Sequence, residues 1–249
     1  MLKPYTSNRL PLSTNNTKTH YYEQDRSISL HLVAIMAICC VYAYACRPSA
    51  RQTTEATPVA TPSAIAPIKG KVLVVYFSSP ETDGVDASSG ASRLVADDKL
   101  YGNTEYVATL IIRKTGGDLF QIKTATPYPG THKALIDAAK KEQETKARPK
   151  LTTHIKNLDD YTTIFIGFPN WWYDMPMPLY AFFDEYDFTG KTLIPFCTHG
   201  GSRFSQTEKT IATLEKGATM VKGLSISRNS VDRSEETINK WLQRLGFNN

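Results

Sequence analysis

Three short segments of the chain contain residues that could bind a flat, phosphorylated ligand. They are Ser78 with the later Gly102-Asn103-Thr104, the segment FPNWWYDMPMP at 168–178, and THGGS at 198–202. Hydroxyl groups and free backbone N–H groups at the start of a helix suit a phosphate group. Glycines let a backbone approach a planar ring closely, and aromatic side chains offer stacking area opposite the ring. The three segments are therefore the candidate ligand-binding loops.

The first of these segments lacks two common nucleotide-binding patterns. It has no lysine in the position required by GxxxxGK[ST], so a nucleoside triphosphate P-loop is not expected. It also lacks GxGxxG, which argues against a dinucleotide site. A plain helix N-cap at Asn103 or Thr104 is the alternative that these residues alone leave open.

The connection between Ser78 and Gly102 is long for a strand-to-helix loop, where 2–6 residues are usual. Residues 79–101 are rich in Asp, Ser and Gly, which predicts a surface excursion at the ligand end of the fold. Asp83 and Asp86 lack the spacing of a calcium-binding EF-hand, and no Cys/His spacing indicates zinc. No metal site is predicted.

The aromatic loop contains two of the three tryptophans of the chain, Trp171 and Trp172. Adjacent residues in a turn rarely point the same way, so we expect one to line the ligand and the other to pack in the core. His199 could act as a general acid or base, but in a glycine loop it is more typical of a residue that lines a pocket or caps a helix. No catalytic residue is assigned.

The segments that must position these loops alternate between two patterns. Apolar, β-branched runs predict strands, and helical spacing of apolar residues predicts the helices between them. Strict alternation indicates one parallel sheet with helices on both faces. The expected strands are 72–78, 118–124, 161–168, 191–199 and 218–227; the expected helices are 103–117, 131–147, 177–187, 205–217 and 234–247.

The N-terminal third has a different composition. Residues 1–27 are polar, 28–46 are almost continuously apolar, and 47–69 are rich in Thr, Pro, Ala and Ser, which is typical of a flexible tether. The α/β domain is expected to occupy 70–249.

The apolar run at 28–46 is interpreted as a signal peptide or a membrane anchor. It ends in Ala43-Tyr44-Ala45-Cys46, which suits signal peptidase and also resembles a bacterial lipobox, although Ala43 and Tyr44 depart from that pattern. Cys46 is therefore the lipidation candidate. We expect an exported, membrane-tethered lipoprotein that faces the periplasm or the cell exterior and contacts the membrane through this segment only. A cytoplasmic protein with a mis-assigned start is the alternative.

The positive charge is concentrated in the same N-terminal third. Residues 1–69 hold 7 basic and 3 acidic residues, a net charge of +4, whereas residues 70–249 hold 22 and 21, a net charge of +1. The domain has no basic stripe interleaved with aromatic residues, so nucleic-acid binding is not expected.

Several motifs resemble the flavodoxin-like family, particularly bacterial members with an enlarged first loop. The motifs are YFS, GNTEYVA, TGGDLFQI, GFPNWWYDMPMP and FCTHGGS, and the resemblance spans about residues 71–247. It implies a doubly wound, five-stranded parallel sheet in the order 2-1-3-4-5 and a non-covalently bound FMN. It further implies that the FMN phosphate is held by Ser78, Gly102, Asn103 and Thr104, and that the isoalloxazine lies between Pro169, Asn170, Trp171 and Trp172 on one side and Thr198, His199, Gly200 and Gly201 on the other.

The sequence departs from the family pattern at three places. The long 79–101 segment separates the two halves of the phosphate site. Tyr173 and Arg203 stand where small residues are usual.

Two functions fit a flavin-binding domain of this composition. Electron-carrier flavodoxins are strongly acidic, which steers them to basic partners. The net charge of +1 of residues 70–249 does not fit this pattern. We therefore favour an FMN-dependent oxidoreductase that takes electrons from NAD(P)H or another donor and reduces a quinone or similar acceptor. A one-electron carrier for protein partners is the alternative, and a flavin-free binding module is a remote one.

Overall fold

The computed structural model describes residues 70–82 and 93–248. The predictions for 1–69, including the lipidation of Cys46, lie outside the described residues, as do Asp83 and Asp86.

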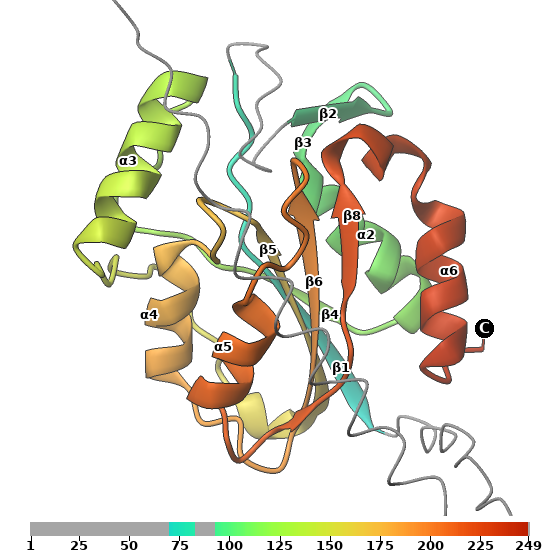
Figure 1. The fold of residues 1–249 in the computed structure, drawn as a ribbon. Helices are drawn as coiled ribbons and strands as arrows, with labels where there is room; N and C mark the ends of the chain where they lie inside the picture. Colours follow the sequence, from blue (N-terminus) through green and yellow to red (C-terminus); the bar gives the residue numbers. More distant parts are fainter. Residues whose placement is uncertain (1–69, 83–92, 249) are drawn as a thin grey trace, which may run out of the picture. The chain divides into compact units, whose positions relative to one another are not determined.

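A parallel sheet forms the centre of the domain (Figure 1). Its strands run in the order β4-β1-β5-β6, and two short strands, β7 and β8, both pair with β6 on its outer side. The predicted 2-1-3-4-5 order is therefore confirmed, with the fifth place shared by β7 and β8. The strands are β1 (Lys71–Tyr76), β4 (Asp118–Gln121), β5 (Tyr161–Pro169), β6 (Thr192–His199), β7 (Thr219–Met220) and β8 (Leu224–Ser227).

Helices cover both faces of the sheet, as the alternating pattern predicted. In Figure 1, α3, α4 and α5 lie on one face, and α2 and α6 lie on the other. None of the helices in the described part of the chain combines the length and the apolarity needed to cross a membrane. The helices are α2 (Asn103–Thr115), α3 (His132–Glu144), α4 (Met177–Glu185), α5 (Thr207–Leu214) and α6 (Glu235–Arg244), with short 3-10 segments η2 (Leu158–Asp160) and η3 (Arg228–Arg233).

The alternation of side chains along β1 divides the core into two layers. Leu73 and Val75 join the cluster under α3, α4 and α5, whereas Val72 and Val74 join the cluster under α2 and α6. All four are at most 5% exposed. A strand buried on both faces needs a continuous apolar run, and VLVVY supplies one.

The strand register brings three strand ends to the same edge. Tyr76 of β1 pairs with Gly167 of β5, and Pro169 at the end of β5 pairs with Thr198 of β6. Ligands of open α/β sheets bind beyond this carboxyl edge, where the strand order reverses. The loops after β1, β5 and β6 therefore emerge together.

The long first connection contains a β-hairpin that the sequence analysis did not predict. Strands β2 (Arg93–Ala96) and β3 (Lys99–Gly102) pair antiparallel. Asp97 and Asp98 join them with φ angles of 49° and 57°, values typical of a two-residue type I′ turn. Because β3 ends at Gly102, the N-cap of α2, the hairpin leads directly into the start of that helix.

Candidate functional site

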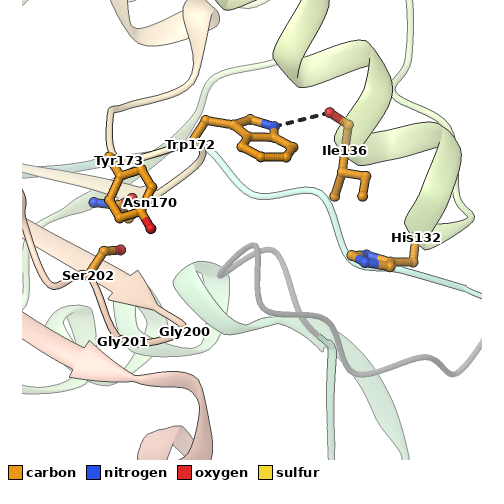
Figure 2. A pocket seen from close by; sticks show the side chains of 8 residues that line it. All are labelled: His132, Ile136, Asn170, Trp172, Tyr173, Gly200, Gly201 and Ser202. Atoms are coloured by element: carbon orange, nitrogen blue, oxygen red, sulfur yellow. Dashed lines mark hydrogen bonds between the residues drawn. The ribbon is translucent and has the colours of Figure 1, made fainter. Parts of the chain in front are cut away.

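A cavity of about 490 Å³ opens at the carboxyl edge of the sheet. Its walls come from the β5–α4 loop, the β6–α5 loop and the first turns of α3 (Figure 2). The lining residues are His132, Ile136, Asn170, Trp172, Tyr173, Gly200, Gly201 and Ser202. Four of the twelve residues that the resemblance implies, Asn170, Trp172, Gly200 and Gly201, thus lie on this cavity.

A strained two-residue turn carries the aromatic wall. The N–H of Trp171 donates to the carbonyl of Asp174 at 2.8 Å, and the N–H of Asp174 donates back to the carbonyl of Trp171 at 3.0 Å. Between them, Trp172 and Tyr173 have φ angles of 51° and 64°. The left-handed region costs a residue with a side chain about 1–2 kcal/mol. The reciprocal hydrogen bonds between Trp171 and Asp174 close the turn that holds both aromatic residues in this conformation.

The two tryptophans have different environments. Trp171 is 3% exposed and packs edge-on against Phe77 at 5.5 Å and Tyr128 at 5.2 Å between ring centroids. Trp172 is 42% exposed and lines the cavity. The structure therefore places Trp171 in the core and Trp172 on the cavity.

Helix α3 holds Trp172 in place. The indole Nε1 donates to the carbonyl of Ile136 at 3.1 Å, as Figure 2 shows, and the Nε2 of Gln143 donates to the carbonyl of Trp172 at 3.2 Å. The Nζ of Lys140 lies 5.4 Å from the centre of the indole ring, within the range of a cation–π contact. This role of α3 was not predicted, because no local sequence pattern shows which helix lies against a distant loop.

Asn170 lines the cavity and is fixed by three hydrogen bonds. Its backbone N–H donates to the carbonyl of Thr198 at 2.8 Å, and its Nδ2 donates to the carbonyl of Arg203 at 2.8 Å and to the Oγ of Ser205 at 3.1 Å. Its Oδ1 is buried and has no hydrogen-bond partner among residues 70–82 and 93–248, which costs free energy. The three hydrogen bonds tie the β5–α4 loop to β6 and to the loop that follows it.

The glycine loop after β6 is braced by His199. Gly201 has a φ of 151°, which a residue with a side chain rarely adopts, and its N–H donates to the Nδ1 of His199 at 3.0 Å. Burial, and next the charge of Arg203, hold the pKa of His199 below its ordinary value. The imidazole is thus neutral and accepts through Nδ1. It does not line the cavity and shapes the loop that does.

The predicted phosphate site is built around Gly102. A Cβ at this position would lie 1.9 Å from the Oγ of Ser78, so only glycine lets this hydroxyl approach. The N–H of Gly102 donates to the Oε2 of Glu105 at 3.3 Å. The first N–H groups of a helix have no intrahelical partner, so the start of α2 suits an anion. The carboxylate of Glu105 already accepts from one of the N–H groups there.

The two other predicted residues of this segment point inward. Asn103 and Thr104 are 2% and 1% exposed. The hydroxyl of Thr104 is hydrogen-bonded to that of Thr198 at 2.8 Å, which ties the start of α2 to the end of β6. Only their backbone N–H groups, at the start of α2, fit the role of phosphate donors that the resemblance implies. Ser78, Gly102, Asn103, Thr104, Pro169, Trp171, Thr198 and His199 do not line the described cavity.

Cys197 of β6 contacts the loop that follows this strand. The thiol of Cys197, 1% exposed, donates to the carbonyl of Arg203 at 3.3 Å, and burial raises its pKa. Within residues 70–82 and 93–248, no group of three His, Cys, Asp or Glu side chains could hold a metal ion.

The comparison with known families agrees with this geometry. A family model described as Flavodoxin matches residues 92–245, more than half of the chain. The chain belongs to the flavodoxin family. The resemblance and the fold class expected from the sequence are thereby confirmed.

Solved structures support the membership. The flavodoxin-family chain is 31% identical to a Bacteroides uniformis protein assigned as a flavoprotein, with a TM-score of 0.55, covering 70% of this chain and 98% of that one. A second such protein, from Bacteroides eggerthii, is 23% identical with a TM-score of 0.54, covers 72% of this chain and 100% of that one, and shows the fold alone. A search of the curated proteins finds no match.

Proposed function

We propose that this flavodoxin-family protein binds FMN non-covalently and passes reducing equivalents to a quinone or a similar small acceptor. The observation that carries the proposal is the open cavity of about 490 Å³ at the carboxyl edge, with aromatic residues on one wall and glycines on another. Sites for small molecules have this size, and a few placed polar groups fix the ligand in them.

The cavity and the start of α2, which does not line it, would hold different parts of FMN. Ser78 and the backbone N–H groups of Asn103 and Thr104 would hold the phosphate beside Gly102, whose own N–H donates to Glu105. Asn170, Trp172 and the 200–201 backbone would border the ring system. When bound, FMN supplies the redox chemistry. The chain contributes binding, orientation and partial exclusion of water.

A one-electron carrier for protein partners is the second candidate. The exposure of Trp172 and Tyr173 at the cavity mouth favours it, because a partner protein could contact the same turn. The domain charge of +1 speaks against it, since acidic carriers use long-range charge to find their partners.

The partners also depend on where the protein acts. If Cys46 is lipidated, a membrane quinone or an exported redox protein is the partner that fits, because nicotinamide cofactors are scarce outside the cytoplasm. Replacing Cys46 by Ser should then release the protein from membranes in a fractionation experiment. Unchanged membrane association would favour an uncleaved anchor.

Cofactor binding is tested by the absorbance spectrum of the purified protein. Bands of FMN, before or after reconstitution, are expected, and their complete absence would overturn both redox functions. Stopped-flow mixing of the loaded protein with NADH, with NADPH and with a chemically reduced quinone then separates the two candidates. Bleaching or turnover with small molecules supports the oxidoreductase. Exchange with redox proteins alone supports the carrier.

A further inference from the structure

The two aromatic residues of the strained turn are anchored very differently. Trp172 makes three contacts with α3. Tyr173 is 75% exposed, and within the described part of the chain its phenol makes no hydrogen bond and no ring contact. Both side chains line the cavity. Trp172 is therefore a fixed wall, whereas the ring of Tyr173 is available to a ligand.

Tyr173 lies where the cavity meets solvent, because it lines the cavity and is 75% exposed. In Figure 2 its ring lies beside Asn170 and Ser202, across the cavity from His132 and Ile136. A flat molecule bound in the cavity can therefore contact this ring.

The backbone at Tyr173 gives no structural reason for a tyrosine. With a φ of 64° the position favours glycine or asparagine. The reciprocal hydrogen bonds between Trp171 and Asp174 close the turn without any help from the phenol. A bulky ring that is unfavourable for the backbone and unused in packing is best explained by a ligand.

We propose that Tyr173 is a specificity-determining residue, which stacks a planar aromatic acceptor at the cavity mouth. This inference rests on the proposed function and names the acceptor class, a fused-ring quinone of about naphthoquinone size. Such a molecule can bind by offset stacking on the Tyr173 ring, whereas a small, non-planar oxidant cannot. Tyr173 contributes binding surface and supplies neither a proton nor an electron.

The test compares two variants of the FMN-loaded, full-length protein with the unaltered one. Tyr173→Gly removes the ring and suits the left-handed backbone, so it should fold, and Tyr173→Phe keeps the ring. Isothermal titration calorimetry of the oxidised protein gives the Kd of a water-soluble naphthoquinone. Steady-state assays give the ratio of kcat/KM for this quinone to that for ferricyanide.

The matched control is Lys146→Gly. Lys146 is exposed, has a φ of 50° and does not line the cavity, so this variant relieves similar backbone strain elsewhere. We expect Tyr173→Gly to raise the naphthoquinone Kd by about threefold to tenfold and to lower the selectivity ratio through KM. Tyr173→Phe and Lys146→Gly should match the unaltered protein.

Each other outcome contradicts a specific claim. Equal naphthoquinone affinity in the FMN-loaded Tyr173→Gly variant and the unaltered protein would overturn the inference alone. Loss of FMN by Tyr173→Gly, with retention by Tyr173→Phe, would place the ring against the cofactor and also overturn it. An unaltered protein that binds no FMN would overturn the proposed function and this inference together.

Discussion

At the scale of single residues, the side-by-side tryptophans show how one turn can serve both the core and the site. Trp171 packs against Phe77 and Tyr128 under the sheet edge, and Trp172 turns toward the cavity. The left-handed backbone at Trp172 makes the two side chains diverge.

Alanine variants of the two residues should therefore fail in different ways. Trp171→Ala removes a buried ring and should lower the free energy of unfolding by about 3–5 kcal/mol. Trp172→Ala should weaken FMN binding by about 0.5–1.5 kcal/mol, through lost stacking, with a smaller effect on stability. Urea unfolding of the apoprotein and fluorescence titration with FMN measure the two effects. The reverse assignment of effects would show that Trp171 contacts the ring.

His199 should make the free energy of unfolding depend on pH, in a direction that follows from its burial. Its pKa in the folded protein lies below the ordinary value of 6.5. The unfolded chain therefore binds the proton first as the pH falls, so the free energy of unfolding should decrease below about pH 6.5. Urea unfolding between pH 5 and 7.5 measures the slope. His199→Gln keeps an acceptor and has no titration in this range, so parallel curves for the two proteins would contradict the prediction.

At the scale of elements, the sequence predicted the main strands and helices because each has a strong and local signal. The run VLVVY, the glycine pair after α2 and the amphipathic pattern of α6 all sit where the structure has those elements. The sheet order was predicted from the resemblance and not from these patterns.

The features that the sequence analysis missed depend on weaker or non-local signals. The β2–β3 hairpin uses Asp97-Asp98 where Asn-Gly or Asp-Gly would be the usual signal. The expected strand at 218–227 splits into β7 and β8, which pair with the two ends of β6. The contribution of α3 to the cavity depends on tertiary packing, which no short window of sequence contains.

The start of α2 carries a prediction about charge. The carboxylate of Glu105 takes the N–H of Gly102 and also pairs with Lys99 at 3.4 Å. Glu105→Gln keeps an acceptor for this N–H and removes a negative charge beside the predicted phosphate site. FMN should then bind more tightly by about 1 kcal/mol, while riboflavin affinity should not change. Equal FMN affinity in both proteins would place the phosphate away from α2.

At the scale of the whole molecule, cofactor binding should be visible as stability. A ligand at 100 times its Kd adds about 2.7 kcal/mol to a protein that binds it only when folded. For a domain of this size, that is a rise in Tm of roughly 5–10 °C. Differential scanning fluorimetry with FMN and with riboflavin at equal concentration measures the rise. FMN should give the larger rise in Tm, and equal rises would show that the phosphate contributes nothing to binding.

The buried Cys197 has a consequence for the folding and handling of the protein. Its thiol is buried and donates a hydrogen bond to the carbonyl of Arg203, and burial raises its pKa, so little of it is thiolate. The thiolate is the form that attacks disulfides and alkylating reagents. Once folded, the domain should therefore not cross-link to Cys39, Cys40 or Cys46 through thiol exchange. Dithiothreitol or an oxidising buffer should leave the domain unchanged, so a reductant can be added to load or reduce a flavin without disturbing the protein.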